Sequence, residues 1–458
     1  MFFLNTSIFS LKYYYAENML EFALILLLGI IFGIIVGLLP GVPGYIAPLI
    51  MFPFVGSLPV EHILTFWLAT HIGSQYFGSV AAILLKIPGE VSSLVYVRDI
   101  GNLDMRQRLD LVRQTAWGST MGNMFALGIL LVVYYFGLST GVIQLSGNNV
   151  KLFLLLTLMG VMCWFSNHRI LSVVLFITGV VFSEKTAGTL PTWVFQTQNY
   201  TTNMTLFGLI LGMLIIPEFI REIIDGKRED PVDVNIKDIK KSKLDFSAMF
   251  RGTWIGSLMG LIPGPSHILS GIVSYNSYKK KDTQKKIISA ESANNSATIS
   301  AIMPFLFIGF PITLSEFLLA DLLQVKMFLM PMDFKNSWSV MGGLNLIEMS
   351  FLVILVSALV YHFMAQRFLG VYEKILHLAY GKLKLIFVAL ICYLIYVDLS
   401  FNPVYLLPYF LTLSVLTWIG YKMLRKDINP MPLVFGYILG DMMTWSGYHF
   451  FKLHLATI

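Results

Sequence analysis

The sequence predicts an all-α polytopic membrane protein that consists of two inverted-topology repeats. Three observations carry this prediction. Of the 458 residues, 56% are hydrophobic and 13% are charged, with a mean hydropathy of +0.72, whereas soluble domains carry about 25% charged residues. The basic residues gather in a few stretches of the chain. A pattern of glycine and proline in the first half recurs 223 residues later.

The composition excludes several classes of protein. The high hydrophobic and low charged fractions exclude a soluble globular protein. The 32 basic and 26 acidic residues give too small a basic surplus for a nucleic-acid-binding protein. Cys163 and Cys392 lie in apolar tracts, where we expect small buried side chains and no disulfide. Residues 1–18 lack the basic region, compact apolar core and cleavage site of an export signal, so we expect the chain to enter the membrane through its own helices.

The basic residues also predict the topology. Of the 32 Lys and Arg residues, 24 lie in five stretches, which should be cytoplasmic. The connectors between them are almost free of basic residues and should face the other side, together with both chain termini. The five stretches are 98–113, 221–251, 279–286, 367–384 and 422–426.

Each half is expected to contain four single spans behind a less regular first part. In the first half they are 114–137, 151–165, 170–182 and 204–219. In the second half they are 344–363, 385–397, 405–423 and 432–450.

The recurring pattern is a ladder of glycines at every fourth position, followed by Pro-Gly. We interpret it as a duplication, with a first membrane repeat at 1–220, a charged cytoplasmic linker at 221–250 and a second repeat at 251–458. The matched positions are Gly29, Gly33, Gly37, Pro40 and Gly41, then Gly252, Gly256, Gly260, Pro263 and Gly264, and also Pro88 with Pro311.

Apolar sequence continues beyond each Pro-Gly, which predicts two short arms and therefore a re-entrant hairpin in each repeat. The first hairpin lies between connectors poor in basic residues, and the second lies between the basic stretches 221–251 and 279–286. One hairpin should thus enter from outside and the other from inside. Inverted repeats of this kind build alternating access in secondary transporters.

A polar cluster follows each hairpin, at 69–79 and at 291–298, and predicts a break in each crossing helix. Interhelical hydrogen bonding is the alternative reading of any one of these residues. Two clusters at equivalent positions favour a site for a carboxylate and a coupling cation. The predicted substrate-binding residues are Pro40, Gly41, Ser74, Gln75, Pro263, Gly264, Asn294, Asn295 and Ser296. The cation-coupling candidates are Gly73, Asn294, Thr298, Lys86 and Glu90, of which the last two could instead lie at the membrane interface.

Several segments resemble the TctA family, the large membrane subunit of tripartite tricarboxylate transporters. They are 37–41, 77–93, 251–264, 274–275, 290–297, 304–311 and the residues Pro432, Gly436 and Gly440, so the resemblance covers nearly the whole chain. Lys86, Pro43-Gly44 and Ile312 depart from the family pattern.

The resemblance implies a multi-pass permease of the bacterial inner membrane that imports a small carboxylate, coupled to a sodium or proton gradient. It also implies two partners, a small TctB-like membrane subunit and a TctC-like extracytoplasmic solute-binding protein. No cofactor is implied beyond the coupling Na+ or H+.

Two other function classes compete. A channel-like pore, or a permease for a different small solute, would also use broken helices. An intramembrane enzyme is weakly supported, because the chain lacks HExxH, GxSxG and P-loop motifs, and Leu439-Gly440-Asp441 lacks the first glycine of a GxGD pattern.

Overall fold

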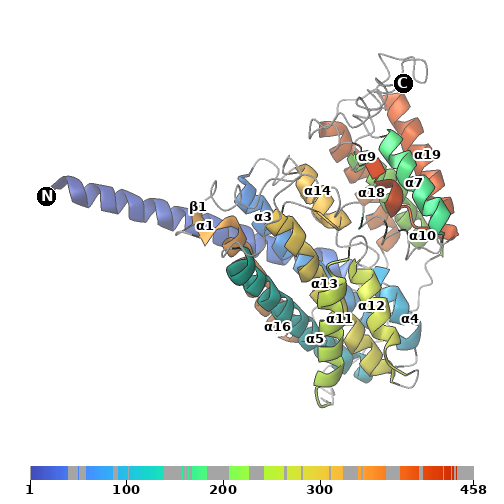
Figure 1. The fold of residues 1–458 in the computed structure, drawn as a ribbon, viewed down its shortest axis with the longest axis horizontal. Helices are drawn as coiled ribbons and strands as arrows, with labels where there is room; N and C mark the ends of the chain where they lie inside the picture. The colour runs from blue at the N-terminus through green and yellow to red at the C-terminus, as the bar shows by residue number, and fades with distance from the viewer. Residues whose placement is uncertain are drawn as a thin grey trace. The chain divides into compact units, whose positions relative to one another are not determined.

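The computed structural model describes residues 2–39, 50, 58–85, 91–101, 103–138, 157, 160, 163, 168–182, 206–225, 242–262, 266–279, 282–308, 311–322, 339–341, 344–367, 382–401, 406–426, 428–434, 436–437 and 440. The chain divides into two compact units (Figure 1). Unit 1 comprises Met1–Ser146 and Arg228–Leu383, and unit 2 comprises Gly147–Lys227 and Lys384–Ile458. Each unit therefore combines segments from both predicted repeats, whose sequence boundaries stay a prediction.

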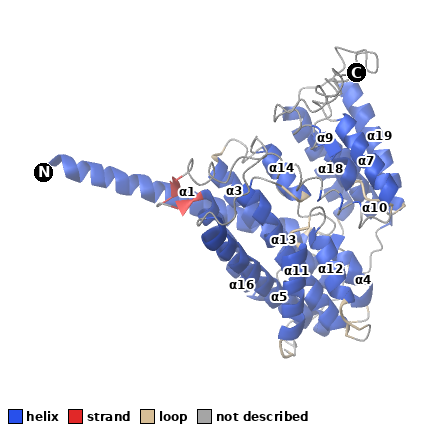
Figure 2. Cartoon of the chain, viewed as in Figure 1, coloured by secondary structure: helices blue, strands red, loops and turns tan. Residues whose placement is uncertain are grey.

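Unit 1 is a bundle of helices with one short antiparallel strand pair (Figure 2). Its first-half elements are α1 (Phe2–Leu38), α3 (Val60–Leu85), the 3-10 turn η2 (Val91–Ser93), α4 (Leu94–Ile100), α5 (Met105–Val132) and the π-helix η3 (Val133–Leu138). Its second-half elements are α11 (Phe246–Met259), α12 (Ser266–Asn276), α13 (Thr283–Ile308), α14 (Leu314–Leu322), β1 (Ser339–Met341), β2 (Leu344–Asn345) and α16 (Leu346–Arg367).

Unit 2 contains α7 (Arg169–Phe182), α9 (Leu206–Ile210), the π-helix η4 (Leu211–Ile215), α10 (Ile216–Asp225), α18 (Leu383–Phe401) and α19 (Leu406–Arg425). Glycines bring its helices together. Gly420 of α19 lies against the Met213 carbonyl of η4, and Gly179 of α7 lies against the carbonyl of Leu433. Side chains at these two glycines would push the helices apart.

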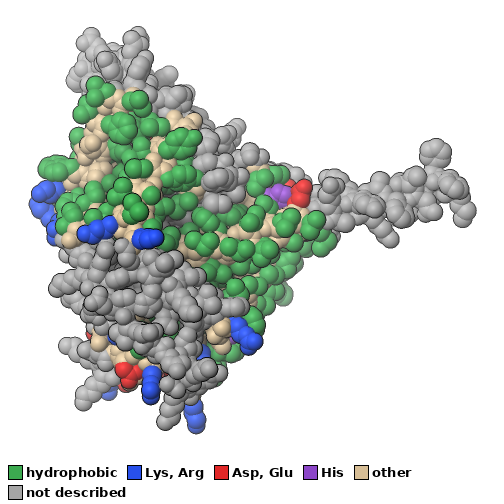
Figure 3. Space-filling view, turned by 180° about the vertical axis from the view of Figure 1, so that it is seen from behind, with side chains coloured by type: hydrophobic (Ala, Val, Ile, Leu, Met, Phe, Trp, Pro, Cys, Tyr) green, Lys and Arg blue, Asp and Glu red, His purple; other side chains and the backbone are tan. Residues whose placement is uncertain are grey.

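The described part of the chain exposes many large apolar side chains and also buries many polar ones, as is typical of a membrane protein. Three described helical segments are long and apolar enough to span a bilayer, Met19–Leu38, Met105–Gly137 and Leu346–Arg367. Apolar side chains cover most of the described surface in Figure 3. Helix α13 buries polar side chains, among them Glu291, Asn294, Asn295 and several serines. The chain is therefore an all-α membrane protein.

Most of the predicted single spans coincide with described helices. Those expected at 170–182, 344–363, 385–397 and 405–423 correspond to α7, α16, α18 and α19, and that at 204–219 corresponds to α9, η4 and α10. The span expected to begin at residue 114 begins earlier, at Met105, because Asp104 and Gln107 form a capping box there. The spans at 151–165 and 432–450 lie largely outside the described residues.

The predicted breaks in the crossing helices are wrong. Both α3 and α13 run as continuous α-helices through the polar clusters. The hydroxyl groups do not require a break because they donate to carbonyls of the preceding turn: Ser74 Oγ donates to the His71 carbonyl at 2.8 Å, and Thr298 Oγ1 donates to the Asn294 carbonyl at 2.9 Å. Polar composition was mistaken for irregular backbone.

The glycine ladders make corresponding contacts in the two halves. Gly37 of α1 packs on Ser74 and Phe77 of α3, and Gly260, at the end of α11, packs on Ala297 and Ser300 of α13. The remaining pairs follow the same rule: Gly29 with Phe66 and Ala69, Gly252 with Ser289 and Ser292, Gly33 with Thr70, and Gly256 with Ala293. In every pair, the second-half residues lie 223 positions after their first-half counterparts.

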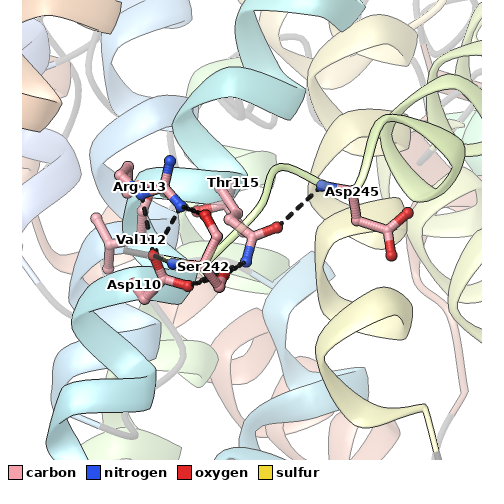
Figure 4. Close-up of polar contacts among 7 residues, drawn as sticks. Asp110, Val112, Arg113, Thr115, Ser242 and Asp245 are labelled. Carbon is pink, nitrogen blue, oxygen red and sulfur yellow. Dashed lines mark hydrogen bonds and ion pairs between the residues drawn. The ribbon is translucent and has the colours of Figure 1, made fainter. Parts of the chain in front are cut away.

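A polar cluster joins the chain just before α11 to the start of α5 (Figure 4). Asp110 accepts hydrogen bonds from the Ser242 hydroxyl and from the Arg113 Nε, the latter at 2.9 Å. Arg113 Nη2 donates to the Ser242 carbonyl at 2.5 Å, and the Asp245 amide donates to Gln114 Oε1 at 3.2 Å. Asp245 also caps α11 by accepting from the Ala248 amide. The beginning of the second half is thus tied to the first.

The two cysteines are both free, as expected, but only one is buried. Cys163 is buried, whereas Cys392 of α18 is exposed. The correction has a simple reason, because an apolar side chain in a membrane protein can face lipid as readily as the interior.

We expect Gly256→Leu to destabilise the fold. A Cβ at position 256 would lie 2.7 Å from the Ala293 Cα, so α11 and α13 must separate, at a cost of about 1–3 kcal/mol or more. The thermal unfolding midpoint of the detergent-solubilised protein should fall. Gly128→Leu is the matched control, because a Cβ there meets nothing within 4 Å; equal midpoints for the two variants would contradict the packing role.

Candidate functional site

The two polar clusters predicted from sequence meet in the structure. Asn294 Nδ2 of α13 donates a hydrogen bond to Gln75 Oε1 of α3 at 2.9 Å, and both side chains are buried. The bond joins residues that are 219 positions apart, one from each half. A buried amide pair of this kind fixes the register of the two helices. It also leaves donor and acceptor capacity on both amides.

The neighbouring predicted residues are engaged in helix packing. Asn295 Nδ2 donates to Ser119 Oγ of α5 at 2.9 Å and to the Glu291 carbonyl at 3.1 Å. Ser296 Oγ donates to the Thr253 carbonyl of α11 at 3.0 Å. These bonds are the interhelical glue that polar residues form in membranes. Asn294 differs because one of its polar atoms stays unused.

Eleven buried polar atoms of the described side chains lack a hydrogen-bond partner. They include His71 Nδ1 on α3, Asn123 Nδ2 on α5, Ser266 Oγ on α12, and Glu291 Oε2 and Asn294 Oδ1 on α13. Buried polar groups are normally paired, so each unpaired one calls for a reason. A polar solute that accepts and donates hydrogen bonds would supply the missing partners.

A histidine pair belongs to the same region. His71 of α3 interacts electrostatically with His267, the second residue of α12. Since α12 begins directly after the predicted hairpin tip Pro263-Gly264, Ser266 and His267 bring the amino-terminal end of a helix toward α3. Helix amino termini favour anions.

A series of side-chain hydrogen bonds holds Tyr76, the residue after Gln75. Tyr76 Oη and Thr120 Oγ1 are 2.7 Å apart, and Thr120 Oγ1 lies 2.8 Å from His362 Nδ1. Gln366 Nε2 lies 2.9 Å from the other ring nitrogen of His362. These hydrogen bonds link α3, α5 and α16, and they thereby support the position of Gln75.

Gly73 lies where α16 packs on α3. The Tyr361 hydroxyl donates to the Ala69 carbonyl at 2.7 Å and occupies the space in front of Gly33 and Gly73. A side chain at Gly73 would collide with this hydroxyl. The structure therefore gives Gly73 a packing role, and its role in cation coupling stays a prediction.

The structure thus brings together some of the predicted site residues. Ser74, Gln75, Asn294, Asn295, Ser296 and Thr298 all lie on the facing helices α3 and α13. Pro40, Gly41, Pro263, Gly264, Lys86 and Glu90 lie outside the described residues.

Sequence reasoning did not single out four residues of this region as site residues. Ser266 and His267 could have been found, since polar residues directly after a hairpin tip are well placed for a site. Glu291 was visible as a charge in an apolar helix. Asn123 gave no signal, because nothing local relates it to the two clusters.

Comparison with known proteins places the chain in a family. The model of the tripartite tricarboxylate transporter TctA family matches residues 23–435. The chain belongs to the TctA family. This family is a transporter component and not an enzyme family, so the chain is a membrane transporter component. No solved structure matches.

Two relatives from Agrobacterium vitis are similar to this TctA chain. An uncharacterized 52.8 kDa protein in the TAR-I ttuC' 3' region is 24% identical over 449 residues, which are 91% of this chain and 84% of the relative. An uncharacterized protein in the TAR-II ttuC' 3' region is 26% identical over 210 residues, which are 41% of this chain and 77% of the relative.

A double-mutant cycle on Gln75 and Asn294 tests the contact at the centre of this region. Gln75→Leu and Asn294→Leu should each lower the free energy of unfolding, because each leaves a buried amide unpaired at a cost of about 1–3 kcal/mol. The two effects should deviate from additivity by about 0.5–3 kcal/mol in denaturant unfolding.

The control cycle combines Gln75→Leu with Thr178→Ala of α7, a half-buried residue whose hydroxyl bonds only within its own helix. Its effects should add. Additive effects for Gln75 and Asn294 as well would mean that the two amides do not interact.

Proposed function

We propose that this TctA-family chain is the permease subunit of a secondary active transporter that imports a small carboxylate, of the di- or tricarboxylate class. The observation that carries the proposal is the buried contact of Asn294 with Gln75, together with unpaired buried polar atoms on α3, α5, α12 and α13. The family description supports a tricarboxylate transporter component. The substrate, the coupling ion and the partners are proposals.

The chemistry of the region suits a carboxylate. Asn123 Nδ2 and Ser266 Oγ are buried groups that can donate hydrogen bonds. Ser266 and His267 are the first two residues of α12, so they lie at the amino-terminal end of that helix. Amide and hydroxyl donors with a helix amino terminus stabilise an anion without a fixed counter-charge. Weak neutral donors also allow release, which a carrier needs on the far side of the membrane. Selectivity would then depend largely on the solute-binding partner.

The duplication is proposed together with the function, and three facts support it. Helices α3 and α13 both have 26 residues and begin 223 positions apart. The turn η2 at Val91 and the helix α14 at Leu314 begin at the same offset. The glycine ladders pack on equivalent residues. With the distribution of basic residues, these facts favour two copies of opposite orientation, each with a re-entrant hairpin.

Each copy also packs against the other. Helix α5 of the first half places Gly118 and Gly122 against Ser292 and the following turn of α13, and α16 of the second half places Tyr361 against α3. Reciprocal packing of this kind lets two halves move about a shared site, as alternating access requires. We propose a TctB-like membrane subunit and a TctC-like solute-binding protein as partners, in the inner membrane.

Uptake by site variants tests the proposal. We expect Asn294→Ala and Asn295→Ala to lose most uptake of radiolabelled citrate, or of another carboxylate from a panel, per molecule of protein in the membrane. Asn294 bears the unused acceptor, and Asn295 holds α13 on α5.

Thr178→Ala should transport normally. Normal uptake by both asparagine variants would remove these residues from the site. Counterflow distinguishes a carrier from a channel-like pore, because unlabelled substrate inside the vesicle accelerates entry of labelled substrate only in a carrier.

Cysteine labelling tests the inverted topology. In a background without Cys163 and Cys392, cysteines at Ser57 and Lys280 should react with membrane-impermeant reagents from opposite sides, because 55–62 is poor in basic residues and 279–286 is rich in them. Labelling of both from one side would rule out the inversion and leave the family membership unaffected.

A further inference from the structure

Glu291 is a buried carboxyl group beside the site, and its two oxygens differ. It lies on α13, one helical turn before Asn294, and 2% of the residue is exposed. The Tyr96 hydroxyl of α4 donates a hydrogen bond to Oε1. Oε2 has no partner. Half of the hydrogen-bonding capacity of this carboxyl is therefore unused.

A buried carboxylate is costly unless a cation or a proton neutralises it. Among the described residues, no ion pair includes Glu291. The two lysines on its own helix are engaged elsewhere. Lys285 Nζ lies 3.5 Å from Asp245 Oδ2, and Lys286 Nζ lies 3.5 Å from Asp99 Oδ2 and 3.8 Å from the centre of the Tyr275 ring. Tyr275 in turn donates to Asp99. The side chains of Asp99, Tyr275 and Lys286 therefore interact with one another, and no counter-charge for Glu291 lies among the side chains that the structure describes.

The other titratable groups on the surrounding helices do not pair with Glu291 either. Among those whose side chains the structure describes are His71 on α3, Asp99 on α4, Arg108, Asp110 and Arg113 on α5, Arg251 on α11, and His267 and Tyr275 on α12. Asp110 and Arg113 pair with each other, Arg108 donates to the Leu103 carbonyl, Arg251 donates to the Ser277 carbonyl, and His71 interacts with His267. Tyr96 remains the titratable side chain that bonds the carboxyl.

The Asn294 side chain supplies the second, independent observation. The Asn294 amide lies within hydrogen-bonding reach of the Glu291 carboxyl and is 2% exposed, its Nδ2 donates to Gln75, and its Oδ1 lacks a partner. Buried acceptor atoms without donors are unfavourable, and a proton on the Glu291 carboxyl would turn one of its oxygens into a donor.

We propose that Glu291 is the proton-binding group of this transporter and that its protonation controls the contact between Asn294 and Gln75. The proposal rests on the proposed function and deepens it by naming the coupling ion. With the proton bound, Oε2 donates to Asn294 Oδ1, and the Asn294 amide group stays on Gln75. When the proton leaves, Oε2 becomes an acceptor and competes with Gln75 Oε1 for the Asn294 N–H groups.

The donor set favours a proton over a metal ion. Hard metal cations are held by about six oxygen ligands. Glu291 and Asn294 together offer two unpaired oxygens, Glu291 Oε2 and Asn294 Oδ1. Among the described residues there is also no group of three His, Cys, Asp or Glu side chains that could hold a metal. A proton needs only one donor and one acceptor.

Carbodiimide labelling tests the proton site without any transport. Dicyclohexylcarbodiimide forms a stable adduct with a buried carboxyl only when that carboxyl is protonated. In the wild-type protein in proteoliposomes, we expect peptide mass spectrometry to locate an adduct on Glu291. Its rate of formation should fall about tenfold for each pH unit above the midpoint of the titration. Added Na+ at constant pH should leave the rate unchanged.

Two variants complete the experiment. Glu291→Gln preserves size and should abolish this adduct, whereas Glu348→Gln, at the start of α16, should retain it. In proteoliposomes that contain the partner subunits, Glu291→Gln should no longer accumulate radiolabelled citrate under an imposed proton gradient.

The outcomes separate this inference from the proposed function. Absence of the adduct from wild-type protein, an adduct that does not depend on pH, or protection by Na+ would each overturn the proton site. Proton-driven accumulation by Glu291→Gln would overturn it as well. If citrate is not transported but the labelling follows pH as expected, the proton site stands and the choice of substrate fails.

Discussion

Close approach of helix backbones at glycine ladders is the constraint on which this structure depends. In a bilayer, apolar surface gives little drive for helices to associate, so packing at short range and hydrogen bonds across the interface must provide it. The ladder of α11 brings Thr253 close enough for its carbonyl to accept from Ser296 Oγ at 3.0 Å. On the other side, Thr70 Oγ1 reaches the Gly29 carbonyl at 3.2 Å. Larger side chains at the ladders would remove both kinds of contact together.

The polar interior follows from this close packing and makes the exceptions informative. Most buried hydroxyls on α3 and α13 find a carbonyl, either one turn back or on the facing helix. The buried polar atoms without a partner include those of His71, Asn123, Ser266, Glu291 and Asn294. They come from four helices of unit 1, and Asn294 is in direct contact with Gln75. Such unpaired polar groups cost free energy, and functional residues within a membrane are expected to carry this cost.

Much of the fold could be predicted from the sequence, because lipid imposes long apolar segments and basic residues mark their ends. Helices α5, α7, α16, α18 and α19 coincide with predicted spans for this reason. The predicted breaks failed because hydropathy responds to polar side chains, whereas the helical backbone continues as long as those side chains find carbonyls.

The site was predicted only where the pattern was local. The polar clusters on α3 and α13 were visible as interruptions of apolar sequence, so Gln75 and Asn294 were found. Their direct contact, and the participation of Asn123 and His267, depend on packing between distant segments. The division into two units has the same origin, because it follows contacts between the halves.

The contact between Asn294 and Gln75 is asymmetric with respect to the proposed duplication. At an offset of 223 residues, Asn294 corresponds to His71 and Gln75 corresponds to Thr298. Two inverted copies would therefore make a second, equivalent contact between His71 and Thr298. In the structure, Thr298 instead donates to the carbonyl of Asn294, and His71 Nδ1 has no partner. Of the two contacts that the proposed duplication relates, the structure therefore makes one, between Asn294 and Gln75, and not the other.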